Sequence, residues 1–161
     1  MKIEKYSFEY EEYESIDELT PSDALLVEEA RKATKLAYAP YSQFQVGAYA
    51  ELASGEFVVG SNQENASYPV GICAERVLMA SAAQLYPNQG VRNMAISYHN
   101  LNGKSNRPLS PCGMCRQALQ EFESRHNQPI RILLSGMEGK VFILKQATML
   151  LPLSFKGDDM K

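Results

Sequence analysis

The sequence predicts one α/β domain, and three observations support this fold class. The chain has 161 residues, the length of one domain, and 45% of them are apolar, which is enough to form a buried core. Apolar residues at helical spacing alternate along the chain with apolar residues at every second position. Only residues 136–139 separate the last two strand patterns, so these strands must be antiparallel, because a parallel pair needs a crossover of about a dozen residues.

The chain opens with an acidic arm and a helix. Residues 1–19 carry seven Asp or Glu against two Lys. Within them Tyr6, Phe8 and Tyr10 alternate with polar residues as in a short edge strand, although a loosely packed arm fits equally well. The segment 20–23 then supplies an N-cap, a proline at the first helical position and an acid in the first turn, so we expect a helix over about residues 21–38.

Strands and two more helices follow. Alternating apolar residues over 44–52, the turn Ser54-Gly55 and the apolar run 57–60 predict a hairpin. A helix that begins near Cys73 is apolar nearly all round and should be buried, and another begins at the Cys112 motif. Further strands are expected at residues 95–98, 130–134 and 141–144.

Three cysteines form the candidate metal site. Cys112 and Cys115 are separated by two residues, and Cys73 lies in a distant segment; in a reducing compartment this set is more typical of metal binding than of disulfides. Three thiolates around Zn²⁺ leave the fourth tetrahedral position open for water, which distinguishes a catalytic site from a closed structural one. Glu75 follows Cys73 by two residues, so its carboxylate is placed to carry protons beside the metal.

Both cysteine motifs lie where a loop leads into a helix. The metal should therefore lie between two helix N-termini, whose partial positive charge favours the thiolate forms. Arg76, Arg116 and Gln117 are candidates to hydrogen-bond the ligand sulfurs and withdraw charge from them. For each of these residues an ordinary surface ion pair explains the pattern as well, and the alternative role of Glu75 is only to neutralise Arg76.

Charge and hydropathy exclude other classes of protein. The net charge is −3 and the Lys and Arg residues are scattered, so we expect no nucleic-acid partner. No apolar run approaches the roughly 20 residues that span a bilayer, and the N-terminus lacks a signal-type stretch. We therefore expect no membrane partner and a cytoplasmic location.

Five segments together resemble the small, three-cysteine type of cytidine deaminase across roughly residues 21–155. They are 38–48, 62–69, 71–76, 111–117 and 150–155. A Cys-x-x-Cys alone is common, but its combination with Cys-Ala-Glu-Arg and Asn-x-Glu-Asn-Ala is highly specific. The resemblance implies a three-layer α/β/α fold with a mixed five-stranded sheet and helices on both faces. It also implies hydrolytic deamination of cytidine and deoxycytidine to uridine and deoxyuridine plus ammonia, a reaction of pyrimidine salvage.

The resemblance also assigns roles to residues. Cys73, Cys112 and Cys115 match the zinc ligands and Glu75 the proton shuttle. The substrate contacts would be Asn62 and Glu64 to the ribose hydroxyls, Phe44 on the pyrimidine, backbone groups near Ala74 to the base, and Tyr68 and Phe155 at the boundary with a neighbouring subunit. A homotetramer with shared active sites follows from the last two assignments. The chain then divides into an N-terminal arm, 1–19, a deaminase domain, 20–155, and a polar C-terminal tail, 156–161.

The residues themselves leave alternatives open. Phe44 on an alternating strand fits a core aromatic, Asn62 and Glu64 fit turn formers, and the segment 150–155 fits a lid on its own subunit. His99 or His126 as a fourth ligand would make a structural Cys₃His zinc site of an interaction module. Within the enzyme class, the alternatives are deamination of a related nucleoside such as blasticidin S, or of free bases.

Overall fold

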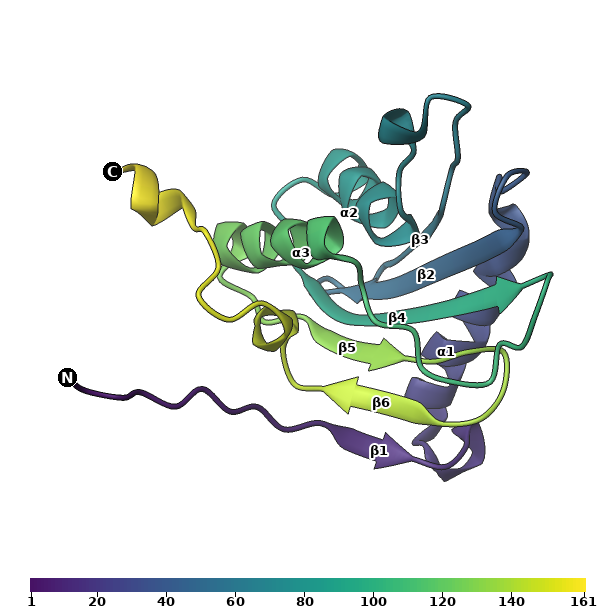
Figure 1. Ribbon diagram of the computed structural model, residues 1–161, viewed down its shortest axis with the longest axis horizontal. Coiled ribbons are helices and arrows are strands. Elements are labelled where there is room, and N and C mark those ends of the chain that lie inside the picture. The colour runs from purple at the N-terminus through teal and green to yellow at the C-terminus, as the bar shows by residue number, and fades with distance from the viewer.

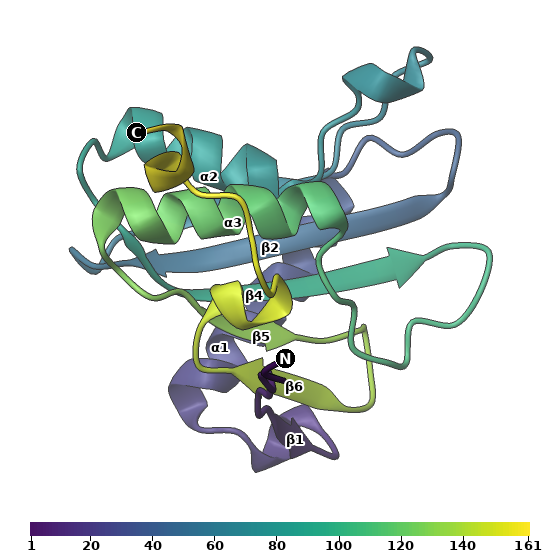
Figure 2. The same cartoon turned by 60° about the vertical axis from the view of Figure 1, so that its left-hand side comes forward.

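A six-stranded mixed sheet forms the middle layer of the molecule, in the order β1-β6-β5-β4-β2-β3. The computed structural model describes residues 1–161. The strands are β1 (Glu11–Tyr13), β2 (Phe44–Leu52), β3 (Phe57–Ser61), β4 (Val91–Asn100), β5 (Arg131–Leu134) and β6 (Val141–Leu144). Helix α1 (Pro21–Ala33) covers one face of the sheet, and α2 (Ala74–Leu85) and α3 (Gly113–His126) cover the other (Figures 1 and 2). The predicted α/β class, with helices on both faces, is confirmed.

The expected number of five strands is wrong, because the acidic arm adds β1 to the sheet. Glu11, Glu12 and Tyr13 pair antiparallel with β6, whereas residues 1–10 have no regular secondary structure. The Glu-Glu-Tyr strand has no apolar alternation, so the sequence pattern gave no signal for it. The aromatic alternation just before it serves packing instead: the Tyr10 ring lies 4.7 Å from that of Phe142 on β6, and the Tyr6 hydroxyl donates to the Met149 carbonyl at 3.0 Å.

The pairing of the other strands follows from their connections. The β2–β3 hairpin is antiparallel, β4 runs antiparallel to β2, and the short turn makes β5 and β6 antiparallel, as predicted. Strand β5 is parallel to β4, which requires a crossover, and α3 supplies it. This crossover leaves the N-terminus of α3 at the edge of the sheet where β4 ends, beside the N-terminus of α2 (Figure 1).

The three helices begin close to where the sequence placed them. The Thr20 hydroxyl accepts from the Asp23 backbone N–H at 3.2 Å and caps α1, and Pro21 occupies the first turn. The helix ends at Ala33, five residues before the expected limit, and continues as a 3₁₀ turn, η2 (Thr34–Leu36). There the Thr34 hydroxyl donates to the Arg31 carbonyl at 2.7 Å, a local bond that competes with regular helix geometry.

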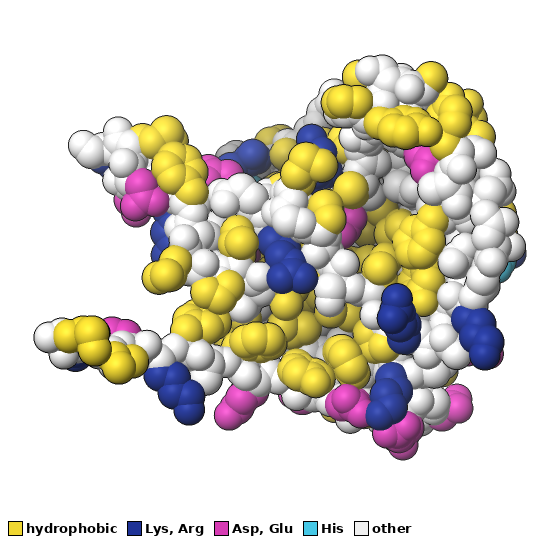
Figure 3. All heavy atoms as spheres, in the orientation of Figure 1, with side chains coloured by type: hydrophobic (Ala, Val, Ile, Leu, Met, Phe, Trp, Pro, Cys, Tyr) yellow, Lys and Arg dark blue, Asp and Glu magenta, His cyan; other side chains and the backbone are white.

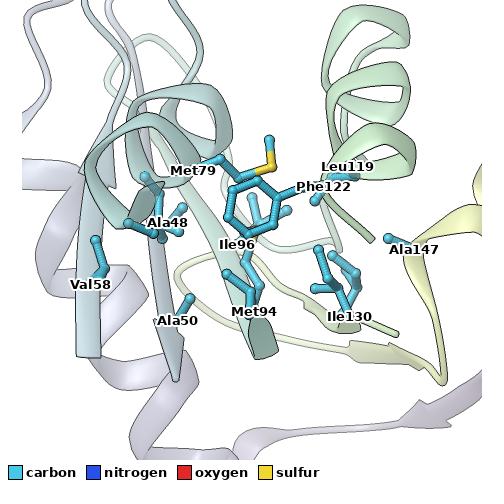
Figure 4. Close-up of a cluster of buried hydrophobic side chains, with 14 of the residues drawn as sticks. Ala48, Ala50, Val58, Met79, Met94, Ile96, Leu119, Phe122, Ile130 and Ala147 are labelled. Carbon is cyan, nitrogen blue, oxygen red and sulfur yellow. The ribbon is translucent and has the colours of Figure 1, made fainter. Parts of the chain in front are cut away.

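The larger part of the core lies between the sheet and the pair α2 and α3. Met79 from α2 and Phe122 from α3 meet over Ile96 of β4 (Figure 4). Helix α2 approaches the sheet closely at Gly60 of β3, where a Cβ atom would lie 2.3 Å from the Ala74 carbonyl oxygen. The missing side chain thus seats the first turn of α2, which carries Glu75, directly on the sheet. None of the three helices combines the length and the apolar character that crossing a membrane demands.

Candidate metal and substrate site

Three sulfur atoms converge at the N-termini of α2 and α3. Cys73 precedes the first residue of α2, Cys112 precedes that of α3, and Cys115 lies in the first turn of α3. The Cys73 and Cys112 sulfurs are 3.8 Å apart, the Cys112 and Cys115 sulfurs are 3.4 Å apart, and all three lie within 4.8 Å of one another. Tetrahedral Zn–S bonds of about 2.3 Å place two sulfurs ~3.8 Å apart, so this donor set fits zinc in both chemistry and spacing.

No histidine joins this cluster. The three cysteines make up the whole group, so neither His99 nor His126 completes a closed Cys₃His site. His126 lies at the far end of α3, with its ring 4.6 Å from that of Phe122. The cluster therefore offers three protein ligands and leaves the fourth tetrahedral position to a non-protein group, as in catalytic zinc sites.

The thiols differ in how readily they ionise. Hydrogen bonds from Cys115 and then Cys112, together with the positive charge of Arg76, lower the pKa of Cys73 to about 6, against the opposing effects of burial and of Glu75. The same hydrogen bond to Cys73, followed by burial and the charge of Glu75, raises the pKa of Cys115. The thiolate is the form of cysteine that binds metal.

Glu75 lies in the first turn of α2, and only 4% of its surface is exposed. Burial raises the pKa of its carboxyl above the ordinary range. None of the ion pairs in the structure involves Glu75, so the neutralisation of Arg76 does not account for it. A buried carboxyl with a raised pKa, beside three sulfurs that could hold a metal, is suited to accept and release protons.

A pocket of about 470 Å³ opens beside the cluster, between Cys73 and the loop that follows β3. Cys73 and Met114 form the side nearest to the cluster, and Asn62, Glu64 and Tyr68 belong to the loop side. The same region is visible as a hollow beneath the projecting loop with η3 (Tyr68–Val70) (Figure 3). The structure thus brings Asn62, Glu64 and Tyr68 to one pocket with Cys73 of the cysteine cluster.

The Glu64 carboxylate is held in place by two backbone groups. Its Oε2 accepts from the N–H of Tyr41 at 2.9 Å and from that of Ser42 at 3.3 Å. Burial acts to raise the pKa of Glu64, but the Ser42 side chain and these two N–H groups outweigh it and lower the pKa below the ordinary value. Glu64 therefore presents a fixed negative charge to the pocket at neutral pH.

The Asn62 side chain is engaged with strand β2. Its Oδ1 accepts from the Val46 N–H at 2.7 Å, and its Nδ2 donates to the Phe44 carbonyl at 2.9 Å. Asn62 thus fastens the loop after β3 to the start of β2. The second hydrogen of Nδ2 and the second lone pair of Oδ1 take no part in these two bonds.

The Phe44 side chain does not line the pocket of Asn62 and Glu64. Its ring stacks on Tyr98 at 4.9 Å between centroids and 17° between planes, and both rings line a neighbouring hollow of about 340 Å³. No sequence pattern predicts this aromatic pair, because Phe44 and Tyr98 are brought together only by the pairing of β2 with β4.

The polar residues after the cysteines contact backbone rather than sulfur. Arg116 donates to the carbonyls of Pro111 and Leu150, each at 2.9 Å, and Gln117 donates to the carbonyl of Phe155 at 3.0 Å. Arg76 influences Cys73 through its charge. Ala74 is fully buried at the start of α2, whereas Tyr68 and Phe155 are 75% and 57% exposed.

Tyr41 and Met114 are among the residues of the pocket wall that sequence reasoning did not assign to the site. Met114 lies between the two cysteines of Cys-x-x-Cys, and 63% of its surface is exposed. A large apolar residue at that place is a usable signal: both cysteines must face the metal, so the positions between them face solvent or substrate. Tyr41 follows Pro40, and its ring lies 5.9 Å from that of Tyr68 across the pocket mouth.

This chain is similar to a family model and to proteins named cytidine deaminase. Residues 20–128 match the family model for the cytidine and deoxycytidylate deaminase zinc-binding region. The cytidine deaminase of Halalkalibacterium halodurans is 35% identical over 137 residues, which cover 84% of this chain and 96% of that protein. The cytidine deaminase of Sporosarcina psychrophila is 34% identical over 137 residues, which cover 84% of this chain and 92% of that protein.

Solved structures give the same result. The crystal structure of cytidine deaminase from Burkholderia pseudomallei superposes with a TM-score of 0.71 at 35% identity, over 85% of this chain and 100% of that one. The cytidine deaminase from Mycobacterium tuberculosis superposes with a TM-score of 0.65 at 28% identity, over 85% of this chain and 98% of that one.

Proposed function

Because this chain belongs to the cytidine and deoxycytidylate deaminase family, we propose that it deaminates cytidine and deoxycytidine to uridine and deoxyuridine, with ammonia as the second product. The enzyme class, a hydrolytic deaminase, is that of its relatives. The proposal rests on one arrangement of groups: three sulfurs that can hold a metal, the buried carboxyl of Glu75, and a pocket lined by Cys73 and by the carboxylate of Glu64.

Zinc is the cofactor of the family region, and Cys73, Cys112 and Cys115 would hold it. At such a site zinc supplies Lewis acidity and lowers the pKa of water towards neutrality. The residues of the chain would supply the other requirements of the hydrolysis: a group that transfers protons, groups that hydrogen-bond to the sugar, and groups that contact the base.

Glu75 is the proposed proton carrier. Its carboxylate takes a proton from the water that attacks C4 of the pyrimidine and delivers this proton to N3. The carboxylate then takes a second proton from the new hydroxyl on C4 and passes it to the amino group, which leaves as ammonia while C4 becomes the carbonyl of uridine. A raised pKa suits both halves of this cycle, because the carboxyl must bind a proton and release it again within one turnover. Positioned proton transfer of this kind contributes roughly 10²- to 10⁴-fold to a rate.

Substrate recognition is assigned to the loop side of the pocket. Glu64, held by two N–H groups, would accept a hydrogen bond from a ribose hydroxyl, and Asn62 would add the free hydrogen of its Nδ2. Backbone groups near Ala74 would contact the polar edge of the pyrimidine. Packing of the Phe44 ring on the pyrimidine rests on the resemblance alone, because that ring stacks on Tyr98 in the neighbouring hollow. The deaminase domain would comprise residues 20–155.

We further propose a homotetramer in which neighbouring subunits complete each site. Support comes from exposed apolar side chains around the pocket and the C-terminal segment: Tyr68, Leu153 and Phe155 are 75%, 103% and 57% exposed. Such side chains gain stability when another chain covers them. The free thiols are typical of a reducing compartment, so we place the reaction in pyrimidine salvage in the cytoplasm.

A substrate panel tests the proposed function. The purified protein is incubated with cytidine, deoxycytidine, cytosine, adenosine and blasticidin S, and the loss of ultraviolet absorbance and the release of ammonia are followed. We expect turnover of cytidine and deoxycytidine and little of the others. Turnover of blasticidin S or cytosine in preference to cytidine would contradict the assignment, and a zinc-containing protein without any turnover would favour a structural role.

A further inference from the structure

A row of polar side chains on α3 holds the C-terminal segment, residues 146–155, through its backbone and one hydroxyl. Arg116 and Gln117 donate to the carbonyls of Leu150 and Phe155. The next turns of the same helix continue the row. Gln120 accepts from the Ser154 hydroxyl at 3.1 Å, and the buried Glu123 carboxylate accepts from the Ala147 N–H at 2.8 Å. Since the row begins directly after the ligand Cys115, the C-terminal segment is fastened to the helix that carries two of the three sulfurs.

Arg116 differs from the rest of the row because its second hydrogen bond reaches the loop that carries Cys112. Its Nε donates to the Pro111 carbonyl at 2.9 Å, while its Nη1 donates to the Leu150 carbonyl at 2.9 Å. One guanidinium thus joins the residue just before Cys112 to the 3₁₀ turn η4 (Ala147–Leu150). The planar fork of arginine reaches two acceptors at once, which the single nitrogen of lysine cannot do in this geometry.

Cys112 needs such a restraint more than the other two ligands. It is the exposed cysteine of the three, whereas Cys73 is half-buried and Cys115 is buried. Pro111 before it has no backbone N–H to donate, and the Gly113 position faces open space, with no atom within 4 Å of a Cβ built there. Among side chains, only Arg116 hydrogen-bonds to the backbone of residues 111–113.

We propose that Arg116 is a positioning residue that fixes the Cys112 sulfur for zinc by joining Pro111 to Leu150, so that retention of the metal depends on the C-terminal segment. The inference rests on the proposed zinc site but not on the identity of the substrate. Contacts that orient metal ligands are worth about 10- to 100-fold in metal affinity, so a loss of this bridge should be measurable.

Arg116→Lys and Arg116→Met test the proposal, with Arg125→Lys as the matched control. Arg125 is on the same helix but near its far end, with its guanidinium 5.4 Å from the Phe122 ring centre. The rate of zinc release to a chromogenic chelator is measured for each purified protein, together with the thiolate charge-transfer spectrum of the Co²⁺-substituted form. We expect both Arg116 variants to release zinc about 10-fold faster or more and to show a shifted Co²⁺ spectrum. Arg125→Lys should behave as the wild type.

Three results would overturn the proposal. If Arg116→Lys retains zinc as the wild type does while Arg116→Met loses it, positive charge matters and the two-carbonyl fork does not. If both variants melt at a lower temperature but release zinc at the wild-type rate, Arg116 serves stability alone. The third result comes from a chain that needs no substitution at Arg116. A chain truncated after Met149 lacks the Leu150 carbonyl and should also release zinc faster, and wild-type release from it contradicts the link to the C-terminal segment.

The same measurements separate this inference from the proposed function. A wild-type protein that deaminates cytidine and holds zinc, with Arg116 variants that hold it equally well, refutes the positioning role alone. A wild-type protein that binds no zinc refutes both.

Discussion

The sulfur of exposed Cys112 lies 3.4 Å from that of buried Cys115, across the first turn of α3. Replacing either one leaves two thiolates, which bind zinc far more weakly than three do. We therefore expect Cys112→Ala and Cys115→Ala each to lose zinc and activity together, as measured by metal analysis of the purified protein and by the cytidine assay. His99→Ala and His126→Ala are the controls and should keep one zinc per chain; a histidine variant without zinc would restore the structural Cys₃His hypothesis.

Glu75→Gln separates proton transfer from metal binding. The amide keeps the shape of the side chain but cannot carry a proton between water, N3 and the leaving amine. We expect kcat to fall by at least ~10²-fold, while zinc content and circular dichroism stay as in the wild type. Turnover close to that of the wild type would remove Glu75 from the mechanism.

Glu64→Gln tests whether the Glu64 carboxylate hydrogen-bonds to the ribose of the substrate. Because Glu64 lies in the pocket away from the proton carrier, the substitution should lower kcat/KM for cytidine by roughly 10-fold or more and leave the slow reaction with cytosine unchanged. Equal losses for both substrates would show that Glu64 does not contact the ribose. Glu64 is a cleaner target than Asn62, whose removal also breaks two bonds to β2 and should cost about 1–3 kcal/mol of stability.

The ion pair between Asp23 of α1 and Arg131 of β5 should make stability depend on pH. Arg131 donates to both Asp23 oxygens, at 2.6 and 2.9 Å, and this bonding holds the pKa of Asp23 below its ordinary value. A lowered pKa in the folded state gives stability that is present above the unfolded pKa, about 3.9, and is lost as the pH falls through the folded value.

Asp23→Asn should therefore lower the free energy of unfolding by roughly 1–2 kcal/mol at pH 7, and the difference from the wild type should shrink as the pH falls below about 4. The measurement is urea unfolding of both proteins at pH 7 and at a pH below about 4. Asp158→Asn is the control, since Asp158 and Lys161 form a pair that is more than 80% exposed on both sides. A difference that is constant with pH would mean that the asparagine acts through packing.

Mixed tetramers test the shared site. Chains with Phe155→Ala are combined with chains carrying Glu75→Gln, and activity is followed across mixing ratios. If Phe155 completes a neighbour's pocket, some mixed assemblies contain one intact site from both parents, and activity exceeds that of the Phe155→Ala chains alone. Simple additivity at every ratio would place Phe155 over its own subunit.

Much of the fold was predictable because its signals are local. The N-cap at Thr20 and the short β5–β6 turn each depend on a few neighbouring residues, and both predictions are confirmed. Helix α2 begins where the sequence placed it, but the expectation that it is buried is wrong, because it packs on the sheet with one face and leaves Ala80 and Leu85 exposed. Strand β1 was not predictable in this way, because Glu11–Tyr13 becomes a strand only through its pairing with β6. The order of the strands likewise depends on contacts between distant segments.

The same distinction between local patterns and contacts of distant segments holds for the residues of the site. The spacing of the cysteines predicted a metal cluster, and the structure brings the three sulfurs together. The roles of Asn62, Glu64, Phe44, Tyr68, Phe155 and the other substrate contacts stay predictions. Hydrogen bonds such as those of Arg116 to Pro111 and Leu150 were beyond reach, since the second partner is 34 residues away and uses a backbone carbonyl, which no sequence pattern marks.

Strand β1 also affects how copies of the protein behave towards one another. Without it, β6 would be the edge of the sheet, with unpaired backbone groups along a strand in which only Phe142 is not buried. Such an edge is a template for strand addition by another chain. β1 covers it and is itself a poor template, because it is three residues long and carries Glu11 and Glu12, the latter paired with Lys140. The acidic arm thus protects the sheet edge from pairing with another chain. A chain without residues 1–13 would keep its three cysteines, and we expect it to aggregate at high concentration.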